Sequence, residues 1–101
     1  MIYDKLVRDK IPEIIGRSGK KATFRILTET EHKEYLERKL DEEVAEFHDS
    51  KDLKEIADIL EVLEALVTVY KATTVVTQAR AKKRKERGGF LTGVCLIEVE
   101  D

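Results

Sequence analysis

Five carboxylate side chains stand close together in the middle of the sequence. They are Glu42, Glu43 and Glu46, followed by Glu55 and Asp58. Carboxylates crowded beside an apolar seam repel one another and resist desolvation, and a bound hard cation relieves both penalties. Because no cluster of histidine or cysteine accompanies these acids, the oxygen ligands suit Mg²⁺ or Mn²⁺ rather than zinc. Such an ion neutralises phosphate charge and lowers the pKa of a bound water.

The spacing of these acids places them beside the apolar faces of two helices. At about 100° per residue, the first three acids fall within one arc of roughly 100°. The apolar stripe next to this arc consists of Leu36, Leu40, Val44 and Phe47. In the next helix, Glu55 and Asp58 lie at i and i+3 along one edge of a second stripe. That stripe consists of Ile56, Ile59, Val62, Leu63 and Leu66. Antiparallel packing of the two helices would bring the two sets of acids face to face.

A solvated helix face is the competing interpretation of the same spacing. Glu-rich helices are common, and most of their acids stay in solvent or pair with Lys and Arg one turn away. The spacing of one set alone favours this interpretation. Two sets on consecutive helices, each beside the packing seam, make the metal site and the solvated face about equally well supported.

Start and stop signals predict the two central helices. Thr28 and Glu31 have capping-box spacing and open a long helix that runs to about His48. Residues 49–52 then form a short connection, and the next helix covers residues 53 to about 71. The predicted fold class is therefore mainly α, an antiparallel helical bundle.

Shorter elements are expected on both sides of these helices. A short helix over residues 12–17 begins with a proline in its first turn. A last helix is predicted over residues 75–87, after a break in the β-branched cluster 73–77 and before a glycine pair. Residues 23–27 and 93–99 are β-prone, so we expect them to pair as a minor two-stranded β element.

Length and composition limit the kind of protein. A chain of 101 residues forms one domain with a modest core, and we expect the bundle to be completed as a homodimer or homotetramer. Hydrophobic residues make up 42% and charged residues 40%, with a net charge of −2, which gives no overall attraction to nucleic acid or membrane. The absence of Asn and the single Gln, beside abundant Lys and Glu, resemble the composition of hyperthermophile proteins.

Neither a targeting segment nor a disulfide is expected. No apolar run approaches the roughly 20 residues of a membrane span, and charges interrupt the first ten residues, where a signal peptide would need an apolar core. The single cysteine, Cys95, excludes an intrachain disulfide and fits a reducing compartment. We therefore expect a cytoplasmic protein without membrane or nucleic-acid partners.

Three blocks of the sequence resemble a known family. Glu42-Glu43-x-x-Glu46 followed by Glu55-x-x-Asp58 resembles the EExxE…ExxD signature of the all-α nucleoside triphosphate pyrophosphohydrolases, the MazG-like superfamily. Residues 3–12 are similar to the start of its small phosphoribosyl-ATP pyrophosphohydrolase-like branch. Residues 83–90 are similar to the ending of that branch. The resemblance extends from Tyr3 to about Val99.

This resemblance implies a reaction and roles for the acids. The reaction is the Mg²⁺-dependent hydrolysis of a nucleoside triphosphate, or of a phosphoribosyl-ATP-like nucleotide, to the monophosphate and pyrophosphate, with house-cleaning as one biological role. Mn²⁺ is the alternative ion. The implied metal ligands are Glu43, Glu46, Glu55 and Asp58. Glu42 and Glu43 are the implied catalytic residues, and Glu42 either orients the attacking water or acts as the general base.

Four basic residues are candidates for substrate binding. Lys39 shares the acidic arc and is expected either to contact phosphate or to pair with the carboxylates. Lys83 and Arg87 belong to a basic run that either reaches the substrate phosphates or complements the dipole of a helix end. We assign both to the phosphates. Arg8 is expected either to shape the nucleotide pocket or to fix the N-terminal segment.

A binding module without catalytic activity is the alternative function. In this hypothesis a helical oligomer uses its acidic seam as a cation or protein interface, and its basic end touches RNA or a partner. The slightly acidic net charge and the lack of aromatic residues among the basic ones argue against nucleic-acid binding. The two functions differ in turnover, which only the enzyme shows.

Overall fold

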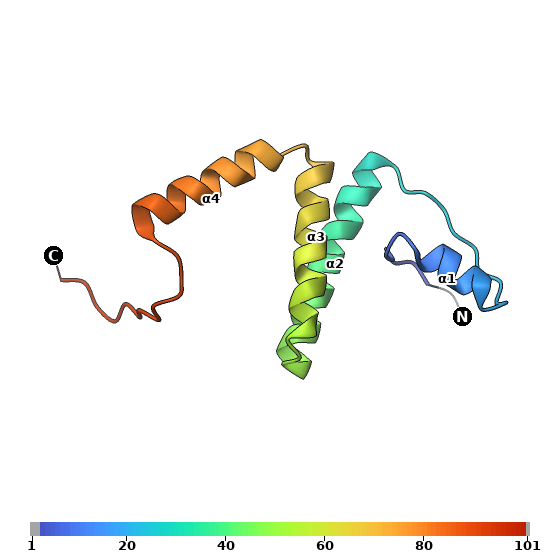
Figure 1. The fold of residues 1–101 in the computed structure, drawn as a ribbon, viewed down its shortest axis with the longest axis horizontal. Helices are drawn as coiled ribbons and strands as arrows, with labels where there is room; N and C mark the ends of the chain where they lie inside the picture. Colours follow the sequence, from blue (N-terminus) through green and yellow to red (C-terminus); the bar gives the residue numbers. More distant parts are fainter. Residues whose placement is uncertain (1–2, 101) are drawn as a thin grey trace. The chain divides into compact units, whose positions relative to one another are not determined.

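The computed structural model of the protein describes residues 3–100. Over this range it contains four helices and no strand: α1 (Ile11–Arg17), α2 (Glu29–Ser50), α3 (Lys54–Val69) and α4 (Thr73–Arg87) (Figure 1). The prediction of a mainly α fold is confirmed. Contacts divide the chain into two compact units, one up to Lys71 and one from Ala72 onward. None of the four helices combines the length and the apolar character needed to cross a membrane.

The antiparallel hairpin of α2 and α3 forms the centre of the first unit (Figure 1). A complete capping box starts α2: the Thr28 hydroxyl accepts a hydrogen bond from the Glu31 N–H, and the Glu31 carboxylate accepts one from the Thr28 N–H. At the other end, Lys51 adopts a left-handed φ of 57° and lets the chain reverse. The Asp52 carboxylate then accepts a hydrogen bond of 2.9 Å from the Lys54 N–H at the start of α3. The two predicted central helices and their short connection are thus confirmed.

The hairpin buries few apolar side chains. In the described range, Tyr35, Leu36 and Val62 are its buried hydrophobic residues. The apolar stripe predicted on α3 divides into two faces. Val62 is buried against α2, whereas Ile56 and Leu63 are 39% and 41% exposed. A core of this size gives little free energy to offset the conformational entropy that the chain loses on folding.

The prediction of a two-stranded β element is wrong. Residues 23–27 and 93–99 form irregular backbone and belong to different compact units. Neither segment takes part in the backbone hydrogen bonds found outside the helices between residues 3 and 100. A β-prone run becomes a strand only where a second strand supplies hydrogen bonds. Without that partner, Ile26 and Ile97 stay 95% and 86% exposed.

The break before the last helix also lies earlier than predicted. The sequence placed it within residues 73–77, but α4 already starts at Thr73. The interruption is at Lys71, where φ is 55°. The β-branched residues continue the helix because their propensity penalty is small, below about 0.7 kcal/mol each. The other helix bounds differ from the predicted ones by only one or two residues, which is within the usual variation of helix ends.

Candidate metal centre

The hairpin of α2 and α3 brings the five predicted acids into two overlapping groups. One group consists of Glu42, Glu43 and Glu46 from α2, and the other of Glu43 with Glu55 and Asp58 from α3. Within each group, one oxygen of every residue lies within 4.8 Å of the others. Oxygens around an octahedral Mg²⁺ lie at most about 4.2 Å apart, which is twice the metal–oxygen distance. The bound of 4.8 Å is therefore slightly wider than the largest oxygen separation in such a shell.

Glu43 belongs to both groups and is the buried acid among them. Its residue surface is 5% exposed, and its Oε2 is the one buried side-chain oxygen or nitrogen of the described chain that lacks a hydrogen-bond partner. Burial, followed by the neighbouring Glu46 carboxylate, raises the pKa of Glu43. Leaving a buried carboxylate oxygen unpaired costs free energy. The oxygen-only set of neighbouring groups is of the kind that would hold a divalent cation such as Mg²⁺.

The acids of α3 form the opposite side of the candidate centre. Partial desolvation raises the pKa of Glu55, and the neighbouring carboxylates of Asp58 and Glu43 raise it further. Carboxylates that disfavour one another's ionisation attract a cation strongly, because the cation reverses that repulsion. Glu43, Glu55 and Asp58 are three of the four ligands implied by the resemblance, and the fourth, Glu46, lies with Glu43 in the other group. The complete ligand set stays a prediction.

Lys39 lies one turn before the buried acid and contacts the centre from α2. Its Nζ is 3.4 Å from Glu42 Oε1 and 3.3 Å from Glu43 Oε1. Partial burial opposes the charge of Lys39, but its hydrogen bond to Glu43 and the charges of Glu42 and Glu43 outweigh this effect and raise its pKa. Of the two roles expected for Lys39, pairing with the carboxylates is present in this structure. Phosphate contact stays a prediction.

Arg8 reaches the centre from the N-terminal segment. Its guanidinium forms an ion pair with the Asp58 carboxylate, although the two residues are separated by 50 positions in the sequence. The ion pair fits the expectation that Arg8 fixes the N-terminal segment. Asp58 could not be predicted as the partner, because no local spacing connects the two residues. Arg8 is thus a second basic side chain, besides Lys39, that neutralises part of the acid cluster.

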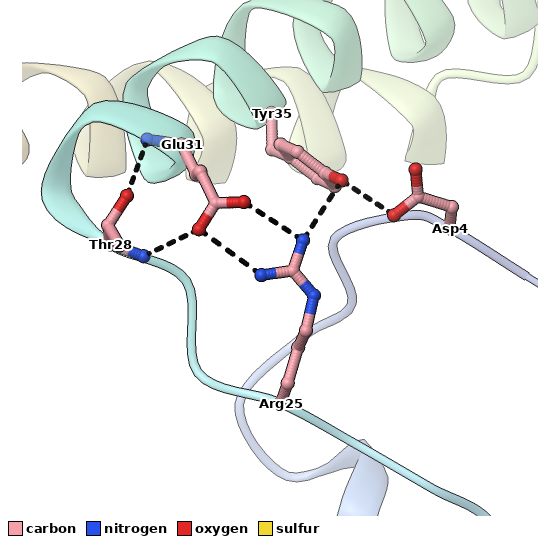
Figure 2. Close-up of polar contacts among 5 residues, drawn as sticks. All are labelled: Asp4, Arg25, Thr28, Glu31 and Tyr35. Carbon is pink, nitrogen blue, oxygen red and sulfur yellow. Dashed lines mark hydrogen bonds and ion pairs between the residues drawn. The ribbon is translucent and has the colours of Figure 1, made fainter.

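A polar network attaches the segments on both sides of α1 to the start of α2 (Figure 2). The Tyr35 hydroxyl donates a hydrogen bond of 2.6 Å to Asp4. Arg25 donates to the two Glu31 oxygens at 3.2 and 3.0 Å, and to the Tyr35 hydroxyl at 3.4 Å. The hydrogen bond from Arg25, followed by that from the Thr28 backbone, lowers the pKa of Glu31 to about 2. The network holds the N-terminal segment beside the helix that carries Glu42 and Glu43.

A pocket of about 100 Å³ lies between this segment and α2, next to Lys39 and Glu42. Its other lining residues are Asp4, Lys5, Leu6, Tyr35 and Arg38. The lining thus combines three basic side chains, Lys5, Arg38 and Lys39, with the acids Asp4 and Glu42.

The two remaining candidates for substrate binding lie in the second unit. Lys83 and Arg87 are exposed residues of α4. Because α4 belongs to the unit from Ala72 onward, the assignment of Lys83 and Arg87 to the substrate phosphates stays a prediction.

Comparison with known proteins gives one partial relative. An uncharacterized protein of Mycolicibacterium smegmatis is 52% identical over 42 residues, which cover 42% of this chain and 43% of the relative. The chain thus spans less than half of the relative's length. No family model matches, and no solved structure matches. The family and the reaction implied by the sequence motifs remain predictions.

Proposed function

We propose that this protein is a magnesium-dependent pyrophosphohydrolase that cleaves a nucleoside triphosphate, or a phosphoribosyl-ATP-like nucleotide, to the monophosphate and pyrophosphate. The observation that carries the proposal is the buried Glu43 carboxylate, whose Oε2 has no hydrogen-bond partner. This carboxylate lies where the acids of α2 and α3 meet. The same acids form the motif that resembles the MazG-like family.

The proposed ligands of the ion are Glu43, Glu46, Glu55 and Asp58. When bound, Mg²⁺ supplies neutralisation of the phosphate charge and a lower pKa for its water. Glu42 is next to these ligands but outside the group that joins α2 to α3. Its Oε1 accepts a hydrogen bond of 3.4 Å from Lys39, which orients the carboxylate. We therefore assign Glu42 to orienting the attacking water or accepting its proton.

The basic side chains of the first unit are proposed to hold the phosphates. Lys5, Arg38 and Lys39 line the pocket beside Glu42, so a phosphate there lies close to the proposed metal ligands. Positioning and neutralisation of charge are the main contributions that a protein makes to phosphoryl chemistry. The arrangement therefore favours a polyphosphate substrate over a neutral one.

A second copy of the chain is the proposed cover for the exposed face of α3. This face consists of Leu53, Ile56, Leu60 and Leu63, which are 39% to 74% exposed. Their spacing of three and four residues is the pattern of a helix-packing seam. Two hairpins joined through this seam would form a four-helix antiparallel bundle with twofold symmetry. The proposed assembly is accordingly a homodimer, or a homotetramer built from two such dimers.

Pyrophosphate release from a panel of nucleoside and deoxynucleoside triphosphates, with Mg²⁺ or Mn²⁺, tests the proposed reaction. We expect Glu43→Gln and Asp58→Asn each to lower the rate at least about 100-fold, because each removes a charged ligand. Glu34→Gln is the matched control, since Glu34 is an exposed acid of α2 outside both carboxylate groups. Circular dichroism checks that the variants keep their helices. Full activity in both ligand variants would refute the metal assignment.

A further inference from the structure

Arg8 forms an ion pair with one of the proposed metal ligands in this structure. Its guanidinium pairs with the Asp58 carboxylate, and the nearby charges of Glu61 and Glu43 also favour its charged form. The chain itself thus places a positive group at the site where a divalent ion is proposed to bind. A carboxylate oxygen that accepts a hydrogen bond from a guanidinium is not fully available to a metal ion, so the two cations compete.

The contact between Arg8 and Asp58 is of a kind that exchanges readily. The two side chains are 59% and 37% exposed, and ion pairs with this much exposure contribute little to stability. The segment that carries Arg8 has a separate attachment, because Asp4 accepts a hydrogen bond from Tyr35. Arg8 can therefore leave Asp58 while the segment stays attached to α2.

We propose that Arg8 is a displaceable counterion of the metal centre. It pairs with Asp58 in the metal-free protein, is displaced when a divalent ion binds, and then contacts the phosphate groups of the nucleotide. The last step rests on the proposed function. A guanidinium suits both positions, because its planar donors match two oxygens of a phosphate as well as those of a carboxylate. The transfer of Arg8 couples binding of the ion to binding of the polyphosphate.

Two binding measurements on the full chain with Arg8→Gln test this inference. The first follows Mn²⁺ alone through the paramagnetic resonance signal of the free ion. We expect the variant to bind Mn²⁺ about two- to five-fold more tightly, because the competing guanidinium is gone. The second follows inorganic tripolyphosphate at saturating Mn²⁺. Here we expect about ten-fold weaker binding, because a charge-assisted hydrogen bond is lost.

Arg17→Gln is the matched control for both measurements. Arg17 pairs with Glu13 inside α1, and neither residue belongs to the carboxylate groups. This variant removes the same charge from a nearby part of the sequence, and we expect both dissociation constants to stay unchanged. The control separates the contact at Asp58 from a general change in net charge. A loss of structure would weaken both ligands rather than strengthen one of them.

The outcomes separate this inference from the proposed function. An unchanged or weaker affinity for Mn²⁺ in Arg8→Gln would overturn the competition at Asp58. An unchanged affinity for tripolyphosphate would overturn the transfer to phosphate. If the unaltered protein binds no Mn²⁺, both the metal centre and the role of Arg8 are refuted. Binding of both ligands without pyrophosphate release would contradict only the proposed hydrolysis. The comparison of Arg8→Gln with the unaltered protein would then still test the displacement of Arg8.

Discussion

Glu43 combines features that oppose stability in the metal-free protein. Its carboxylate is buried, one oxygen is unpaired, and desolvation together with Glu46 raises its pKa. The neighbouring Glu55 also has a raised pKa, first because of desolvation. Natural proteins commonly keep such unfavourable groups at functional sites. A cation bound by Glu43 and Glu55 would remove this local penalty.

The raised pKa values of Glu43 and Glu55 predict how stability depends on pH. Between the ordinary value of about 4.3 and the raised value, the folded form holds protons that the unfolded chain releases. The stability of the metal-free protein consequently rises as pH falls through this window and is lost as pH rises through it. We expect the melting temperature without metal to increase as pH falls from neutral towards the ordinary carboxyl value of about 4.3.

Glu43→Gln should remove part of this pH dependence, because the amide keeps the shape of the side chain but carries no charge. At pH 7 without metal, we expect the variant to melt at a higher temperature than the unaltered protein. Added Mg²⁺ should raise the melting temperature of the unaltered protein but not that of the variant. Glu34→Gln serves as the control and should keep the original profile. A variant that melts lower at pH 7 and still responds to Mg²⁺ would contradict the role of Glu43.

Sequence spacing predicts which acids come together but not their individual environments. The i, i+3 and i, i+4 positions of Glu42, Glu43 and Glu46 follow from helix geometry alone. The burial of Glu43 depends on how α2 and α3 pack, which the sequence does not specify at the level of single atoms. The contact between Arg8 and Asp58 depends on the path of an irregular segment. No periodic pattern describes such a path.

At the scale of elements, the capping box of α2 has a direct energetic consequence. The Thr28 hydroxyl and the Glu31 carboxylate each accept a hydrogen bond from the other residue's backbone, and Arg25 holds Glu31 in place. Thr28→Ala should lower the free energy of unfolding by about 1 kcal/mol in urea denaturation. Affinity for Mn²⁺ should be unchanged, because the cap lies several turns before the acids.

The matched control for this prediction is Thr68→Ala on α3. The Thr68 hydroxyl donates to the Glu64 carbonyl one turn earlier within the helix, a bond that adds little stability. We expect this variant to change the free energy of unfolding by less than about 0.5 kcal/mol, since alanine has the higher helix propensity. Equal losses in both variants would show that the cap has no special contribution.

Local signals explain why the helices were predictable and the β element was not. The cap at Thr28 and the periodicity of α2 and α3 act within a few residues, so the sequence carries them fully. Strand formation at 23–27 and 93–99 required a partner far away in the chain. The two segments lie in different compact units, and their β-prone composition does not contain that information.

At the scale of the whole molecule, the small core of the hairpin and the exposed face of α3 favour self-association. Leu60 is 61% exposed in the middle of that face. We expect Leu60→Glu to convert the assembly to monomers in sedimentation experiments and to lower the melting temperature, because the charge would be buried in the interface. The control is Leu91→Glu, which alters an equally apolar residue that is fully exposed and lies beyond α4. An unaltered protein that sediments as a monomer would contradict the proposed assembly.

Anomalous diffraction from crystals soaked in Mn²⁺ locates the proposed ion without reference to any reaction. We expect an anomalous peak between α2 and α3, about 2.2 Å from oxygens of Glu43 and Asp58. We also expect that the Arg8 guanidinium no longer contacts Asp58 in these crystals. The soak uses Mn²⁺ at several millimolar. The metal centre would be refuted if no anomalous peak appeared between the carboxylates of Glu43, Glu55 and Asp58 while these side chains stayed in place.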